Sequence, residues 1–199
     1  MVPALFRQHQ KNNIFIFIVF LLLSFILSLS SCEAKKAATA IEVITAVTDA
    51  SPDTAAGDLY LLPNARSFLE LGQAEERQMC VRVASDELLF AAFPGVFSSK
   101  ENFEVDQKTQ EIIDDGALYF SISASPEQYA VLHCTSRTDT QRIALLLEKR
   151  LQVLRKQYHG TEWEEMVESG QVVVIKKYVC LIVSPNVQAA LNAAEKMIT

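Results

Sequence analysis

The chain has 199 residues, and its 18 Lys and Arg side chains against 24 Asp and Glu give a formal net charge of −6 at pH 7. This acidic balance argues against nucleic acid as a partner, because a phosphate backbone is bound by a basic protein surface. The length suits one ordinary domain with a short extension.

Residues 1–31 have the pattern of a secretory signal peptide. Arg7 and Lys11 precede an uncharged, apolar run at residues 14–29, and small residues follow it. The end of this segment, Leu29-Ser30-Ser31-Cys32, resembles the lipobox of bacterial lipoproteins. That resemblance implies that the Cys32 thiol receives a diacylglycerol and that a peptidase cuts directly before it. Cys32 would then be the lipidated first residue of the mature chain.

An uncleaved membrane anchor is the alternative interpretation of the same segment. The apolar run is long enough to span a bilayer, and Lys35 and Lys36 reduce the charge asymmetry that would orient it. Both interpretations place residues 33–199 outside the cytoplasmic membrane and tethered to it. We therefore expect a membrane location on the extracytoplasmic face, with the lipid anchor favoured.

Residues 32–58 are predicted to hold the lipidated cysteine, a tether and a short helix. The tether is small and polar at residues 33–40, and Ile41, Ile44 and Val47 then recur at helical spacing. A turn-rich linker follows at residues 49–58. The extracytoplasmic domain is predicted to cover residues 59–199.

The first part of this domain gives weaker signals. Short strands are predicted at residues 59–62 and 80–83, with a helix between them. A further helix is expected at residues 85–95, because Ser85 can cap its start and Pro94-Gly95 can end it. A second short helix is expected at residues 107–113.

The second part begins with a clear hairpin and a long helix. Residues 117–123 alternate Leu118, Phe120 and Ile122 on one face, and residues 128–134 also have a strand-like composition, which predicts two paired strands. The helix covers residues 138–158, with Thr138 and Gln141 as a capping box. Gly160 should supply the left-handed residue that ends it.

A second hairpin and a final helix complete the predicted domain. The hairpin covers residues 170–184 around a turn at Lys176-Lys177, and its nearly continuous apolar runs indicate central strands. The last helix should begin after Ser184 as its cap and run through Met197. The order of elements predicts an α+β fold: a two-layer sandwich whose antiparallel sheet is built from two hairpins, with the helices packed on one face.

Residues 145–185 carry a resemblance to a known family. Glu148-Lys149-Arg150 in the long helix, the acidic segment after it and Lys177-Tyr178 before VCLIVS resemble small lipoproteins of Gram-positive anaerobes, the domain-of-unknown-function family four-three-five-eight. The resemblance extends over about residues 85–195. Residues 53–82 exceed the family pattern, and lysine stands in the turn where the family usually has glycine. The family has no assigned activity, so the resemblance supplies no catalytic residue.

Three cysteines remain after Cys32, namely Cys80, Cys134 and Cys180, all in strand-like apolar settings. An odd number cannot all pair within one chain. Buried free thiols are expected, since cysteine packs as a small hydrophobic residue. A disulfide between Cys134 and Cys180 on neighbouring strands is the alternative.

No constellation typical of catalysis or metal binding is found in the sequence. His133 and Cys134 are adjacent on a predicted strand, so their side chains point to opposite faces and cannot form a dyad. His159 lies at the end of the long helix, where a cation suits the negative helix terminus. The sequence has no HExxH, GxSxG, P-loop or paired CxxC motif. We expect no catalytic, cofactor-binding or metal-binding residues.

Two charged groups near the long helix leave alternatives open. An acidic group surrounds Trp163, and we interpret it as a solvated helix face, with a metal or enzyme site as the alternative. A basic group shares the long helix with two acids, Asp139 and Glu148. A solvated face is favoured for it, and contact with anionic lipid or an anionic envelope polymer is the alternative. The acidic group is Glu162, Glu164, Glu165 and Glu168, and the basic group is Arg142, Lys149, Arg150, Arg155 and Lys156.

The sequence therefore predicts a non-enzymatic lipoprotein that binds or scaffolds something at the cell envelope. Its partners would be the lipid bilayer, through acylated Cys32, and an envelope protein or anionic polymer. The alternative is an envelope enzyme or enzyme subunit with its site near residues 159–168.

Overall fold

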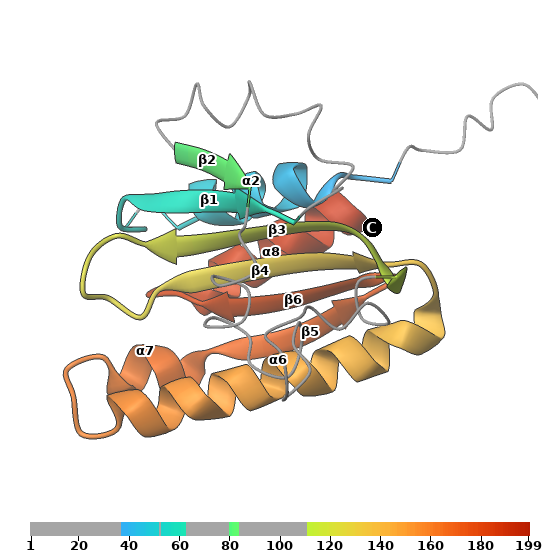
Figure 1. Cartoon of the computed structure of the whole chain (residues 1–199). Coiled ribbons are helices and arrows are strands. Elements are labelled where there is room, and N and C mark those ends of the chain that lie inside the picture. The colour runs from blue at the N-terminus through green and yellow to red at the C-terminus, as the bar shows by residue number, and fades with distance from the viewer. Residues whose placement is uncertain (1–36, 52, 63–79, 84–110) are drawn as a thin grey trace, which may run out of the picture. The chain divides into compact units, whose positions relative to one another are not determined.

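The computed structural model describes residues 37–51, 53–62, 80–83 and 111–199. Within these residues the chain forms a six-stranded sheet and four helices (Figure 1). The strands are β1 Gly57–Leu61, β2 Cys80–Val83, β3 Ile113–Ser121, β4 Gln128–Cys134, β5 Gln171–Ile175 and β6 Tyr178–Val183. The helices are α2 Ala40–Asp49, α6 Arg137–Tyr158, α7 Glu164–Ser169 and α8 Val187–Ile198.

The sheet has the order β2-β1-β3-β4-β6-β5 and contains both predicted hairpins. The pairs β3–β4 and β5–β6 are antiparallel, as are β1–β3 and β4–β6, whereas β1 and β2 are parallel. The α+β class and the pairing within each hairpin are therefore confirmed. The short strands predicted at residues 59–62 and 80–83 are present as β1 and β2.

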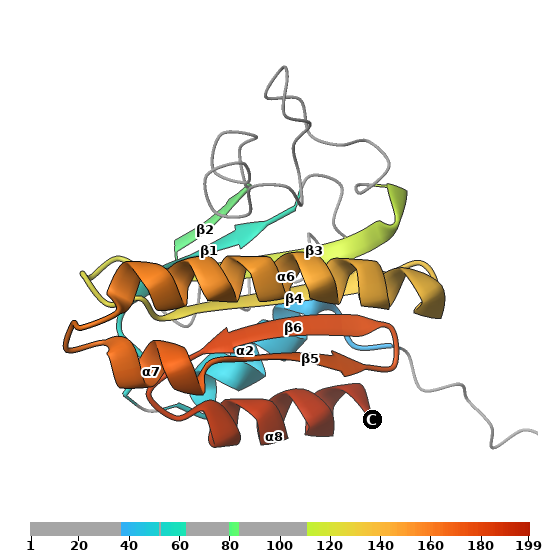
Figure 2. The same cartoon turned by 90° about the horizontal axis from the view of Figure 1, so that it is seen from below.

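Helices cover both faces of the sheet. The Tyr178 hydroxyl donates to the carbonyl of Ala38, just before α2, while the side chain of Val183 lies beside Gly170 and Leu151 of α6. Tyr178 and Val183 are five residues apart on β6, so they point to opposite faces. Helices α2 and α8 contact each other and one face, and α6 packs on the other with α7 (Figures 1 and 2).

The predicted arrangement with all helices on one face is therefore corrected to three layers, helices–sheet–helices. The physical reason lies in β4 and β6, whose residues are all buried. A strand with one solvated face alternates between apolar and polar residues, whereas continuous burial requires cover on both sides. The apolar run of β6, at the centre of the sheet, fits this burial on both faces.

The position of β5 also differs from the prediction. Among the described residues β5 is one of the two edge strands, beyond β6, and its Val174 side chain is 47% exposed. Its β-branched run QVVVI still favours a strand. Strand propensity is set by the residue type, but only the tertiary pairing decides whether a strand is central or at the edge.

Helix α2 belongs to the core of the domain. Its capping box is complete: the Thr39 hydroxyl accepts from the Glu42 amide, and the Glu42 carboxylate accepts from the Thr39 amide at 2.6 Å. Its buried residues are spread almost all round the helix because it packs against both the sheet and α8. Residues from Ala38 onward form one compact unit.

Two predicted helix caps are displaced by two residues. Helix α6 is capped by Ser136, whose hydroxyl accepts from the Asp139 amide, so the Thr138–Gln141 capping box is wrong. Helix α8 is capped by Asn186, not Ser184. Ser184 is buried and shares a hydrogen bond with Ser51 at 3.1 Å. In both cases the residue that caps the helix, Ser136 or Asn186, is at least as strong a capping residue as the predicted one two positions away.

Several predictions lie outside the described residues. They are the signal segment with Cys32, the helix between the strands at residues 59–62 and 80–83, the helix at residues 85–95 and most of the helix at residues 107–113. The end of that last helix is wrong, because Ile113 is the first residue of β3.

Gly160 is left-handed, as predicted, with φ of 73°. The helix itself already ends at His159, whose ψ is 131°, and Gly160 lies in the following turn, which the Thr161 amide closes by donating to the Tyr158 carbonyl at 3.1 Å. A Cβ atom at this position would meet nothing within 4 Å. The Gly160→Ala variant should therefore lose about 1–2 kcal/mol of unfolding free energy from backbone strain alone. Urea denaturation measures the loss. The Gly160→Asn variant is the control and should lose less, because asparagine tolerates this conformation; an equal loss in both variants would contradict the backbone explanation.

Candidate functional site

Buried polar side chains of the sheet lie near the start of α2 and bind the backbone there. The Asp115 carboxylate accepts from the Ala40 amide at 2.8 Å, where the positive end of the helix dipole favours an anion. His133 is buried, shares a hydrogen bond with the Asp114 carboxylate through Nδ1, and stands edge-on to the Tyr178 ring at 4.6 Å between centroids. His133 is thus a sheet-face residue, as predicted, and its contacts are made within the domain.

A second buried group fixes the segment before β1. The Glu127 carboxylate accepts from the Ala55 amide at 2.9 Å and from the Tyr129 hydroxyl at 2.7 Å. The Tyr119 hydroxyl donates to the Ala55 carbonyl. Burial raises the pKa of Tyr119 to about 12 and raises the pKa of Tyr129 as well, so both remain neutral donors at physiological pH. Sequence reasoning missed this group, because residues so far apart in the chain give no local signal.

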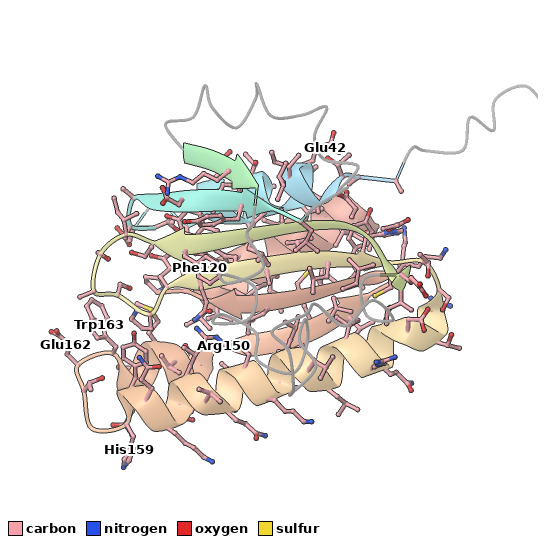
Figure 3. All side chains as sticks on the ribbon, in the orientation of Figure 1. Glu42, Phe120, Arg150, His159, Glu162 and Trp163 are labelled. Atoms are coloured by element: carbon pink, nitrogen blue, oxygen red, sulfur yellow. The ribbon has the colours of Figure 1, made fainter. Side chains whose placement is uncertain are left out.

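Residues 159–168 form an exposed surface in which only Val167 is buried. His159 is 80% exposed and lies 2.5 Å from Glu164 through Nδ1, and the Gly160 amide donates to the same carboxylate at 3.0 Å. The Gly160 amide first, and His159 second, hold the pKa of Glu164 below its usual range. In Figure 3 the side chain of His159 points away from those of Glu162 and Trp163.

The acidic group is therefore not gathered around a single point. Glu162, Glu165 and Glu168 are exposed, and Glu168 instead lies 3.5 Å from the Nε atom of Arg155. In the part of the chain that the structure describes, no group of three or more His, Cys, Asp or Glu side chains could hold a metal ion. The arrangement offers a solvated surface and supplies no observation in favour of the enzyme alternative.

The five basic residues of α6 divide into two kinds. Arg150 points toward the sheet (Figure 3), where its Nε and Nη2 lie 3.4 and 3.3 Å from the Gln128 side-chain oxygen. Desolvation lowers the pKa of this guanidinium. Arg155 donates through Nη2 to the carbonyls of Glu168 at 3.1 Å and Gly170 at 3.2 Å. These two arginines thus bind within the domain.

The other three basic residues of α6 face solvent. Arg142, Lys149 and Lys156 are exposed and are spaced seven residues apart, so they lie on one side of the helix. Of the sequence-predicted group of five, Arg150 and Arg155 are thereby shown to contact groups of the domain itself. Amphipathic periodicity identifies the buried side of a helix, but it does not show which Lys and Arg side chains bend back to contact the protein.

Cys134 and Cys180 are buried free thiols, as the sequence favoured. Cys180 pairs with Val131 across the β4–β6 ladder and therefore points to the same face as Val131 and His133. Cys134 is the neighbour of His133 and points to the opposite face. The alternative disulfide between them is wrong for this reason.

Arg155 should stabilise the domain, because its hydrogen bonds join α6 to the segment that leads into β5. The Arg155→Ala variant removes two charge-assisted hydrogen bonds and should lose about 1–3 kcal/mol of unfolding free energy. The matched control is Lys156→Ala on the next, exposed position, which should change stability by less than about 0.5 kcal/mol. Denaturant unfolding measures both. An equal loss of unfolding free energy in the two variants would mean that the hydrogen bonds of Arg155 contribute nothing to stability.

The two buried thiols should resist alkylation in the folded protein. Desolvation raises the pKa of Cys134 and of Cys180 to about 12, from an ordinary value of 9.0, so little thiolate forms at pH 8. The pKa of each thiol is higher in the folded than in the unfolded protein. Neutral burial of the thiols therefore contributes fully to the free energy of unfolding below pH 9.0, and this contribution is lost as the pH rises toward 12. Iodoacetamide labelling mapped by mass spectrometry should modify both residues only in denaturant. Rapid native labelling of either thiol would contradict this expectation.

Comparison of the chain with family models, with curated proteins and with solved structures gives no match. The resemblance to family four-three-five-eight therefore stays a prediction. Among the described residues no helix is long and apolar enough to cross a membrane, and the apolar run at residues 14–29 lies outside them.

Proposed function

We propose that the chain is a lipid-anchored extracytoplasmic lipoprotein whose α+β domain binds or scaffolds a component of the cell envelope. The observation that carries the proposal is the order of features at the N-terminus: basic residues, an uncharged run, and Leu29-Ser30-Ser31-Cys32. This order fits a secretory signal that ends in a lipidation site.

The short distance between the anchor and the domain supports a role close to the membrane. The compact unit begins at Ala38, six residues after Cys32. A fully extended chain covers at most about 3.3–3.6 Å per residue, so this tether reaches about 20 Å. A domain held so close is suited to contacts with the membrane or with molecules at its surface.

Binding is favoured over catalysis by the use of the titratable side chains. Asp115, Glu127 and His133 each contact groups of the domain itself, and Glu164 contacts Gly160 and His159. A general acid or base needs reach to a substrate. Within the described residues these groups instead hold the chain together, which leaves the exposed surface as the working part of the domain.

The anchor is tested by replacing Cys32. In the native host, metabolic labelling with an alkyne fatty acid should mark the wild-type protein and leave the Cys32→Ala variant unmarked, because the acylated thiol is gone. The Ser31→Ala variant keeps a small residue before the cysteine and serves as the control; it should remain labelled. Undiminished labelling of Cys32→Ala, or an unlabelled wild-type protein that stays in the membrane, would overturn lipidation at Cys32.

A further inference from the structure

Strand β5 has an open side in the sheet. Within the described residues it pairs with β6 on one side and with no strand on the other. Helices α6 and α8 contact β5, and Figure 2 shows them on either side of it. The helices therefore cover the faces of β5, and the edge between them stays open.

The direction of the backbone groups along this edge follows from a hydrogen bond of the neighbouring strands. The Cys134 amide donates to the Lys177 carbonyl at 2.8 Å, so this carbonyl points toward β4. Backbone groups alternate in direction along a strand, so the next residue, Tyr178, points its amide and carbonyl toward β5. Tyr178 lies opposite Ile175, which therefore points its own backbone groups toward β6.

The same alternation leaves two residues of β5 with outward backbone groups. Ile175 and Val173 point toward β6, so Val172 and Val174 point their amides and carbonyls out from the free edge. In the part of the chain that the structure describes, no backbone hydrogen bond outside the sheet reaches these two valines. The edge thus offers two donors and two acceptors in the spacing of a strand.

Strand β5 also lacks the features that usually prevent such an edge from pairing. An edge strand is commonly protected by an internal charge, a proline or a β-bulge. The sequence of β5 is QVVVI, and its register with β6 is unbroken. Val174 is 47% exposed, so an aliphatic side chain accompanies the outward amide and carbonyl. The edge is therefore suited to accept a further strand.

A second copy of β5 satisfies this edge completely. If two copies pair antiparallel about Val173, Val172 of each copy lies opposite Val174 of the other. Residues opposite each other in a hydrogen-bonded pair exchange both N–H···O bonds. All the outward groups are then used, and the exposed Val174 packs against Val172 of the second copy.

The charges at the two ends of β5 favour the antiparallel arrangement. The turn after the strand carries Lys176 and Lys177, whereas α7 before it carries Glu164, Glu165 and Glu168. The two lysine ammonium groups donate to backbone carbonyls, which do not cancel their charge. Antiparallel pairing brings the basic turn of one copy to the acidic α7 of the other. Parallel pairing would bring like charges together, which is unfavourable.

We propose that β5 pairs antiparallel with β5 of a second copy of this chain, so that two sheets join across a two-fold axis at Val173. This inference goes beyond the proposed function and does not depend on the lipid anchor. The two Val173 residues form a non-hydrogen-bonded pair, with Cα atoms about 4.5 Å apart. Five residues from each copy make a small interface, so covalent trapping is the suitable measurement.

Disulfide cross-linking of the full-length protein, in the cells that express it, tests the register. All variants carry Cys180→Ala, because Cys180 lies opposite Val173 on β6 and would trap a new thiol there. On oxidation with copper phenanthroline, Val173→Cys should give at least about fivefold more covalent dimer than Val174→Cys, whose thiol faces Val172 of the second copy. Val174 is the more exposed of the two positions. Equal or stronger cross-linking through Val174→Cys would indicate random collision and would overturn the proposal.

A mixed pair checks the register at a second point. Gln171 of one copy should lie opposite Ile175 of the other. Differently tagged Gln171→Cys and Ile175→Cys chains, produced together, should therefore cross-link to each other more than either does to itself. A mixed product no stronger than the self-products would overturn antiparallel pairing about Val173.

The backbone contribution is tested on the Val173→Cys protein. Val174→Pro removes an outward amide and leaves the bonds to β6, so the covalent dimer should be lost; Val174→Thr keeps the amide and should retain it. Protection of Cys134 from iodoacetamide shows that each variant is folded. If Val174→Pro exposes Cys134, Val174→Lys replaces it, because a charge blocks an edge without removing an amide. A dimer that persists in the folded variant, or cross-linking of Val173→Cys only to a different protein, would overturn the proposal.

Discussion

The pairing of β4 with β6, buried on both faces, is the constraint on which the rest of the structure depends. Every residue of the two strands is buried, so apolar side chains project from the centre of the sheet in both directions. One layer of helices could cover only half of this surface. The chain therefore needs α6 on one side and the pair α2 and α8 on the other, which brings its first helix into the core.

Burial on both faces also decides where the polar groups can act. A carboxylate or imidazole withdrawn from water must find a partner, because an unpaired charge in the interior is costly. Asp115 meets this need at the Ala40 amide, Glu127 at Ala55 and Tyr129, and His133 at Asp114. These contacts tie the N-terminal segment to the sheet. These buried carboxylates and this imidazole thus serve to stabilise the fold, and the exposed surface remains for function.

Helix α6 shows how one element serves both purposes. Its inner side fills the core, and Arg150 and Arg155 reach back to Gln128 and to the carbonyls that precede β5. Its solvent-facing side carries the exposed Lys149 and Lys156 together with the exposed Leu145 and Val153. Arginine suits the inward role because its planar group donates several hydrogen bonds at fixed angles, whereas lysine, with a compact and strongly hydrated charge, suits the exposed positions 149 and 156.

The sequence by itself determined the elements whose signals are local: both hairpins, the long helix to Tyr158, the left-handed Gly160 and the opposed faces of neighbouring His133 and Cys134. It did not place the helices on both faces, put β5 at the edge, choose Ser136 and Asn186 as caps, or separate Arg150 and Arg155 from the exposed cations. Each of these depends on groups distant in the chain, such as Gln128 for Arg150 and Gly170 for Arg155. Periodicity and propensity report the environment that a segment requires, and only tertiary contacts decide which other segment provides it.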